Sequence, residues 1–308
     1  MTAVEQMTSG IDALCGLLGK LPIDALRYPF MQRATAAVFL LAPLCAVIGI
    51  QVVNFRLAFF ADAVSHSAFT GMGLGMVGAL LLGSAGLAER SLQYGQAMMI
   101  GFGLFVALAI TYQRRRSGLS SDTIIGVFSS AAVALGLVLF SVKRLSAGST
   151  AFLSFLQGSV VLVSSEDLLI LGGFFVAAMA FVAYAYNRLL LVGLNSDLAQ
   201  VLEINVPRYE YAFAAFLSLL VMFCIPIVGA LVVTAFLVIP AAAARNFATN
   251  AGAVFWWAVA IALSSGLFGL YLADHYDTPV GATIVLCNTL WFAGSQVFYA
   301  LVRNRVSG

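Results

Sequence analysis

Charged residues are scarce in this chain of 308 residues. Only 9% of the residues are Asp, Glu, Lys or Arg, and 62% are hydrophobic. Because a soluble domain carries about 25% charged residues, this composition excludes a soluble globular protein and indicates one that crosses a membrane many times. The net charge of +2 also gives no reason to expect binding to nucleic acid.

Cysteine is scarce as well, and the common nucleotide-binding motif is missing. The four cysteines stand singly, at positions 15, 45, 224 and 287, without a C-x-x-C pair. We therefore expect them to fill space between helices rather than to form a disulfide framework or a metal cluster. The chain contains no G-x-x-x-x-G-K-[ST] sequence, so any ATP that drives it must be hydrolysed by a separate subunit.

Long apolar runs predict an all-α, polytopic membrane protein with eight or nine membrane-spanning helices. The nine expected spans are residues 34–54, 60–84, 97–111, 122–142, 168–187, 211–227, 229–244, 252–272 and 280–302. Eight is the alternative count, because 229–244 is short enough to be a half-helix. Residues 149–163 are apolar but shorter than the roughly 20 residues that a bilayer requires, so they predict a re-entrant half-helix.

Polar segments organise the rest of the chain. Residues 1–33 predict an amphipathic lead-in at the membrane interface, and 34–308 form the transmembrane domain. A turn is expected at Glu89–Gln93, and Pro226 with Gly229 should break the long apolar run between the sixth and seventh spans. The positive-inside rule applied to Arg114–Arg116 places the N-terminus outside and the C-terminus in the cytoplasm, with Lys143 and Arg144 as the exception.

The second span carries a carboxylate and an imidazole four residues apart, Asp62 and His66. Residues at this spacing lie on one face of a helix, one turn apart. An ionisable residue inside a membrane is costly and indicates a functional site. Spacing alone leaves two interpretations open: a pair of metal ligands, or an Asp–His pair that hydrogen-bonds neighbouring helices.

Small residues follow this pair along the same span. Gly71, Gly75, Ala79 and Gly83 recur every four residues, which predicts a ridge for close helix packing. Gly73 lies seven residues beyond His66, hence on nearly the same face, and is expected to leave room above the imidazole.

Two ligands are too few for a transition metal, since tetrahedral sites require four. A two-fold homodimer would bring the same patch of two subunits together and supply two Asp and two His. Carboxylate and imidazole suit Zn(II), Mn(II) or Fe(II), and the thiolates that favour Cu(I) are missing. Binding should weaken as the pH falls, because a ligating histidine must be neutral and a ligating aspartate ionised.

Two polar segments are further candidates. Residues 195–207 predict a short amphipathic helix in the cytoplasm, capped by Asn195 or Ser196 and ended by Pro207; it is either a connector or a docking element. Its apolar side consists of Leu198, Val201 and Leu202. Asp274, His275 and Asp277 cluster in an expected outside loop, as a solvated turn or as a contact for an ion or a receptor.

Four stretches resemble a known family. Asp62–Ser67 with its glycine run resembles the signature of ABC-type permeases that import zinc, manganese or ferrous iron. Residues 122–138, 197–206 and 228–245 resemble the family's fourth membrane segment, its coupling helix and its most regular block. The four stretches occur in the family's order, and the resemblance covers residues 34–302.

The resemblance implies a homodimeric permease in a bacterial cytoplasmic (inner) membrane. Two ATP-binding cassette ATPase subunits and an extracytoplasmic metal-binding protein would be its partners. It would hold no permanent cofactor and would be a transport protein rather than an enzyme. Asp62 and His66 match the family positions that contact the metal, Zn(II) or Mn(II), in transit. Asp197, Leu198, Ala199 and Glu203 belong to the helix that meets the ATPase.

Zinc is the first expectation for the metal, since residues 276–287 are most similar to the zinc permeases. Manganese and iron(II) are the alternatives, and Ser129 and Ser130 stand where some zinc members carry a histidine. A rival from another class is an ion-coupled secondary transporter in which Asp62 and His66 relay protons, although no inverted repeat is evident. A second rival is a structural membrane subunit without a transport site.

Overall fold

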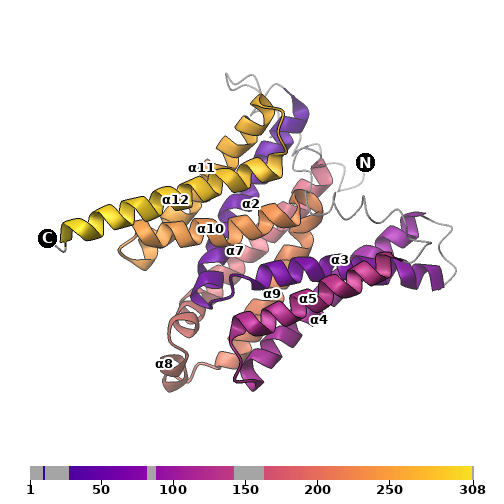
Figure 1. Ribbon diagram of the computed structural model, residues 1–308, viewed down its shortest axis with the longest axis horizontal. Helices are drawn as coiled ribbons and strands as arrows, with labels where there is room; N and C mark the ends of the chain where they lie inside the picture. Colours follow the sequence, from indigo (N-terminus) through magenta and orange to yellow (C-terminus); the bar gives the residue numbers. More distant parts are fainter. Residues whose placement is uncertain (1–9, 11–27, 82–87, 142–162, 307–308) are drawn as a thin grey trace. The chain divides into compact units, whose positions relative to one another are not determined.

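The computed structural model describes residues 10, 28–81, 88–141 and 163–306, and every regular element in these ranges is helical (Figure 1). The long helices are α2 (Pro29–Asn54), α3 (Phe60–Leu81), α4 (Ala88–Arg116), α5 (Ser121–Phe140), α7 (Ser165–Leu194), α9 (Val206–Val228), α10 (Ala230–Phe247), α11 (Ala251–His275) and α12 (Val280–Val306). One short helix, α8 (Ser196–Val201), lies between α7 and α9. The all-α prediction is confirmed for this part of the chain.

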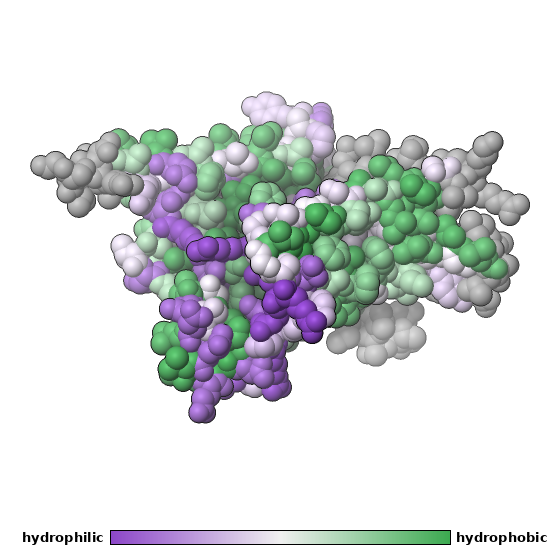
Figure 2. Space-filling view, turned by 60° about the horizontal axis from the view of Figure 1, so that its bottom comes forward, coloured by the Kyte–Doolittle hydropathy of each residue, from purple (hydrophilic) through white to green (hydrophobic). Residues whose placement is uncertain are grey.

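Eight of the described helices are long and apolar enough to cross a membrane, which confirms the predicted range of eight or nine. The one long helix outside this set is α3, which carries Asp62, His66 and several glycines; the 229–244 segment is inside it. That segment forms an 18-residue helix, α10. Figure 2 shows the corresponding surface on one face of the molecule, where apolar side chains cover broad areas and hydrophilic ones gather in patches.

Several predicted boundaries are corrected by the structure. The turn expected at Glu89–Gln93 is wrong, because these residues already belong to α4, which begins at Ala88. The same helix continues through Arg114–Arg116, so the basic cluster forms its last turn. Cations are favourable at that position because the C-terminal end of a helix carries partial negative charge.

Two prolines act differently from the prediction. Pro207 does not end the short helix; it lies in the first turn of α9, where a missing N–H costs nothing because that group has no partner in the helix. Pro226 lies within α9, which continues to Val228. The break between the sixth and seventh spans is confirmed, and it occurs at Gly229, whose φ of 93° and ψ of 151° suit a residue without Cβ.

Some expectations lie outside the described residues. These are most of the 1–33 lead-in, the re-entrant segment 149–163 except Val163, the Lys143–Arg144 exception to the positive-inside rule, and Gly83. The last residues of the lead-in, from Pro29 on, are the first turns of α2.

The contacts divide the chain into two compact units. The first comprises Met1–Val53, Gln157–Tyr186 and Ile227–Gly308, and the second Asn54–Leu156 and Asn187–Pro226. In the first unit α10, α11 and α12 pack on one another. In the second, α3 packs along α4 and α5, and the three helices lie side by side in Figure 1.

Close backbone approach holds the first unit together. A Cβ on Gly49 of α2 would collide with the Leu237 carbonyl of α10, and one on Gly269 of α11 would lie 2.7 Å from the Ile284 Cα of α12. A buried polar pair joins α11 to α12, where the Ser265 hydroxyl lies 2.9 Å from Asn288 Oδ1. The three described cysteines, at positions 45, 224 and 287, are buried, as predicted.

The second unit uses the glycine ridge that the sequence predicted. A Cβ on Gly71 would lie 2.7 Å from the Met99 Cα of α4, and one on Gly75 would lie 2.5 Å from the Tyr94 carbonyl oxygen. Ala79 is buried on the same ridge. On another side of α3, the Thr70 hydroxyl donates to the Ala132 carbonyl of α5. The ridge thus sets the distance between α3 and α4.

Candidate metal site and coupling helix

The Asp62–His66 pair has the geometry that its spacing predicts. Imidazole Nε2 of His66 lies 3.4 Å from carboxylate Oδ2 of Asp62, one turn apart on α3. Helix α3 begins at Phe60, so Asp62 is in its first turn, where the helix dipole favours a negative charge. The pair therefore lies at the end of α3 that the predicted topology places toward the cytoplasm.

Both side chains remain partly exposed within the chain. Asp62 keeps 53% of its side chain exposed and His66 keeps 28%, whereas Phe60, Ala63 and Val64 are fully buried. The imidazole shares its face of α3 with Thr70 and Gly73, which contact α5. A partly exposed polar pair on a membrane helix predicts that something else covers it.

Nearby hydroxyl groups do not contribute to the pair. Ser65 donates to the Ala61 carbonyl and Ser67 to the Val64 carbonyl, so both side chains bond to their own helix. Across the described ranges, no group of three or more His, Cys, Asp or Glu side chains comes together. Within one copy of this part of the chain, the pair is an incomplete metal site.

The prediction that Gly73 opens space above the imidazole is corrected. A Cβ on Gly73 would lie 3.1 Å from the Phe140 ring and 3.3 Å from the Leu139 Cβ, both at the end of α5. The Phe140 ring in turn stacks on Phe69 of α3, with 4.3 Å between the centroids. Gly73 therefore serves helix packing.

The same contacts set the register of α5 against α3. Gly136 of α5 faces Phe69 and Thr70, and Phe140 faces Gly73, so the two helices run in the same direction. Nearly two turns before Gly136 come Ser129 and Ser130, which this register places near the level of Asp62 along the axis. Ser129 is half-buried and Ser130 is exposed.

The Asp274, His275 and Asp277 cluster is an ordered, exposed turn. His275 ends α11, and its ring is stacked 6.3 Å from that of Tyr271 and lies edge-on, at 4.9 Å, to Tyr276. The Thr278 N–H donates to the Ala273 carbonyl, and Asp277 has a positive φ of 51°. The turn closes α11 without bringing together three ligand side chains.

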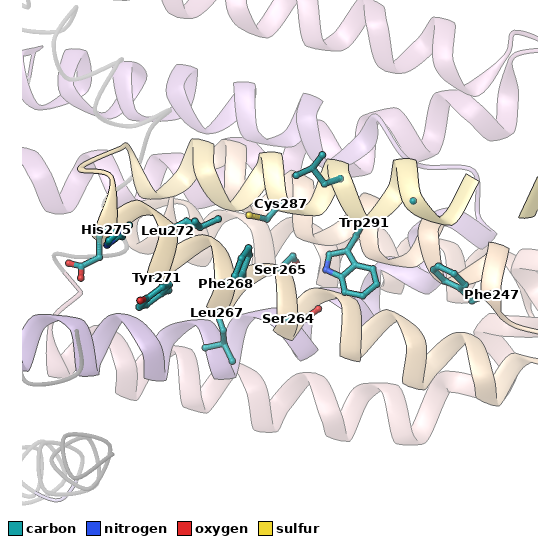
Figure 3. A pocket seen from close by; sticks show the side chains of 13 residues that line it. Phe247, Ser264, Ser265, Leu267, Phe268, Tyr271, Leu272, His275, Cys287 and Trp291 are labelled. Carbon is teal, nitrogen blue, oxygen red and sulfur yellow. The ribbon is translucent and has the colours of Figure 1, made fainter. Parts of the chain in front are cut away.

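An open groove of about 1470 Å³ runs along α11 and α12 in the first unit (Figure 3). Its wall is largely apolar and aromatic, and includes Phe268, Tyr271 and Trp291. His275 lies at one end in Figure 3, and Asp274 also lines the groove. The hydroxyls of Ser264 and Ser265 donate to backbone carbonyls of α11, so the groove offers few ligands to a metal ion.

The short helix predicted at 195–207 forms as α8, with Asn195 rather than Ser196 as its cap. Asn195 Oδ1 accepts from the Leu198 N–H at 3.0 Å. The helix ends where Glu203 takes a positive φ of 57° and the Ile204 N–H donates to the Ala199 carbonyl. The expected apolar side is exposed: Leu198 is 47%, Leu202 57% and Val201 78% accessible. Ala199 is buried and faces inward.

Sequence reasoning missed two contacts next to α8. Arg115 at the end of α4 forms an ion pair with Glu210 in the second turn of α9. Arg188 of α7 donates to the Tyr209 hydroxyl at 2.6 Å and lies 5.9 Å from the centre of that ring. The partners are 95 and 21 residues apart, so no local pattern in the sequence could indicate either contact.

Comparison with known proteins places this geometry in a family. Residues 27–299 match the ABC 3 transport family. The chain belongs to that family. Membership confirms the predicted resemblance, and with the apolar helices it makes the chain a multi-pass protein of the cytoplasmic membrane. Chains of the ABC 3 family are transport permeases rather than enzymes.

Relatives in the ABC 3 family carry different metals in their names. The high-affinity zinc uptake system membrane protein ZnuB of Haemophilus influenzae is 28% identical, over 82% of this chain and 91% of that protein. The manganese import system permease protein ScaB of Streptococcus gordonii is 26% identical, over 86% and 90%. A solved structure, PsaBC from Streptococcus pneumoniae in complex with Fab, has a TM-score of 0.72 at 26% identity, over 88% of this chain and 93% of that one.

Proposed function

We propose that the chain is the permease subunit of an ATP-driven importer of a divalent transition metal, with zinc as the first candidate. The observation that carries the proposal is the partly exposed Asp62–His66 pair on α3, with 3.4 Å between imidazole and carboxylate. Family membership and the relatives' names support the transported class. Manganese or iron(II) is the alternative, because both metals accept carboxylate and imidazole ligands.

The proposed mechanism is alternating access around a site shared by two copies. Each copy contributes one Asp62 and one His66, which together make the four ligands that a single copy does not supply. The ion passes from an extracytoplasmic binding protein to this site. ATP-driven closure of two ATPase subunits, transmitted through the 195–207 helix, exposes the site first outward and then toward the cytoplasm. An incomplete site in each half permits release, because the ligand set is lost when the two copies move apart.

Helix α8 is the proposed docking element for the ATPase. Its exposed Leu198, Val201 and Leu202 form an apolar surface that a water-facing helix does not need for its own fold. The exposed carboxylates of Asp197 and Glu203 flank this surface, and buried Ala199 anchors the helix from behind.

We expect Val201→Glu to remove most of the ATPase that co-purifies with the chain, about tenfold or more, because a buried charge costs an interface at least 1.4 kcal/mol. Thr249→Glu adds the same charge to the exposed loop between α10 and α11 and should leave co-purification unchanged. Retention of the ATPase by the Val201 variant would contradict docking through α8.

Glu203→Gly separates the carboxylate from the backbone at this position. Glycine accepts the positive φ readily, so α8 keeps its end while the charge is lost. A drop in co-purified ATPase would assign a contact to the Glu203 carboxylate. Unchanged binding would limit Glu203 to shaping the helix end.

Reconstituted vesicles test the transport class. We expect uptake of Zn(II) only when the chain is assembled with its ATPase and ATP is present, and none from a proton gradient with the chain alone. Uptake by the chain alone, driven by the gradient, would establish the ion-coupled secondary transporter. A parallel series with Mn(II) and Fe(II) ranks the three metals.

A further inference from the structure

Three contacts tie the start of α9 to other parts of the second unit. Tyr209 is held by Arg188 of α7, and Glu210 by Arg115 of α4. The Phe213 ring stacks on Phe55, in the link that precedes α3, with 5.1 Å between the centroids. Only four residues separate α8 from α9. A displacement of α8 is therefore passed over a short link to the start of α9.

Helix α4 continues the connection toward the metal pair. Besides the Arg115–Glu210 contact, α4 meets α9 near Gly103, where a Cβ would collide with the Met222 side chain. One to two turns before Gly103, α4 presents the Met99 backbone to Gly71 and the Tyr94 backbone to Gly75 of α3. Helices packed this closely move together rather than deform. Helix α3 carries Asp62 and His66.

The Arg115–Glu210 ion pair lies where α4, α8 and α9 meet. A polar cavity of about 240 Å³ joins α4, α8 and α9, and its lining includes Arg115, Glu210, Ser196 and Gln200. Glu210 is 19% and Arg115 35% exposed, so water screens the pair only in part. Arg114 is oriented beside it by donating from Nε to the Ser121 hydroxyl at 3.0 Å.

We propose that Arg115 and Glu210 are positioning residues that couple α8 to the metal pair. The ion pair holds the start of α9 to the end of α4, so α4 follows the movement of the coupling helix α8. Helix α3 then follows α4, because the glycine ridge packs the two together. The inference rests on the proposed function and adds to it the residues through which ATP hydrolysis governs access to Asp62 and His66. Loss of the Arg115–Glu210 ion pair should uncouple ATP hydrolysis from metal transport, because it changes neither the ATPase subunits nor Asp62 and His66.

The test uses the full transporter, this chain with its ATPase, reconstituted in vesicles with metal-loaded binding protein outside. Arg115→Glu and Glu210→Arg should each lower metal uptake about tenfold while ATP hydrolysis falls less than twofold. The charge-swapped double variant should restore uptake to within about threefold of the wild type, because the pair is re-formed in reverse. The readout is metal uptake per ATP hydrolysed. If the two residues had only a structural role, this ratio would not fall in the single variants and recover in the double variant.

Arg116→Glu is the matched control. Arg116 is next in sequence, but its guanidinium lies over Tyr112 of its own helix, 5.1 Å from the ring centre, and so makes no link between helices there. Its reversal should change uptake per ATP by less than twofold. The milder variant Glu210→Gln keeps the side-chain shape and should show the same uncoupling if the reversed charges prevent folding.

Three results would overturn the inference: single variants with unchanged uptake per ATP, a double variant no better than the poorer single, or a parallel loss of uptake and hydrolysis in the milder Glu210→Gln variant. Failure of the wild-type transporter to move any of the three metals would instead count against the proposed function. The two failures are therefore distinguishable.

Discussion

Replacement of Asp62 by Ala, or of His66 by Ala, is expected to reduce metal uptake about 100-fold at equal abundance in the membrane. Each change removes one ligand from each copy, and even residues that only support metal ligands cost about 10- to 100-fold when mutated. Asp62 is exposed and His66 partly exposed, so neither change removes a buried side chain and neither should prevent folding. Uptake of radioactive or fluorescently detected zinc into vesicles provides the measurement.

Isosteric variants and a neighbouring serine make this test specific. Asp62→Asn and His66→Gln keep approximate size and polarity but weaken ligation, so they should resemble the alanine variants. Ser67→Ala removes a hydroxyl that bonds only to its own helix in the structure and should keep at least half of wild-type uptake. Unchanged uptake in both Asp62→Ala and His66→Ala would remove the basis for a metal site here.

A lower pH should mimic loss of the pair. Protons compete with the metal for imidazole and carboxylate, so uptake should fall as the pH is lowered. The residual uptake of His66→Ala should depend less on pH than that of the wild type. This difference separates competition at the site from a general effect on the transporter.

Gly75→Ala is expected to destabilise the protein by about 1–3 kcal/mol, the usual range for adding a methyl group to a filled interior. Its Cβ would lie 2.5 Å from the Tyr94 carbonyl oxygen and 2.7 Å from the Gly95 Cα, and backbone atoms cannot move aside as a flexible side chain can. Helices α3 and α4 would have to separate. Thermal unfolding of the detergent-purified protein, followed by loss of the monodisperse peak, measures the change.

Gly78→Ala is the control on the same helix. No heavy atom lies within 4 Å of the position its Cβ would take, so the added methyl meets open space. Its melting temperature should equal or exceed that of the wild type, because alanine is the better helix former. Equal melting temperatures for the two variants would contradict the packing role of the ridge.

The sequence by itself determined the class of the protein and the local features of its helices. Apolar length specified the spans, and the four-residue spacing predicted both the Asp62–His66 contact and the ridge of Gly71 and Gly75. These predictions succeed because hydropathy and helix periodicity are properties of the residues within a single helix. The same local signals failed at Pro207, since proline is as compatible with the first turn of a helix as with its end.

Only the tertiary structure decided what each helix face touches. Gly73 packs against the Phe140 ring instead of leaving room above the imidazole. In the described part of the chain, no third ligand side chain joins Asp62 and His66. It also joined Arg115 to Glu210 across 95 residues. Such pairings depend on how distant helices pack, and a side chain's spacing along one helix carries no information about the helix that will lie against it.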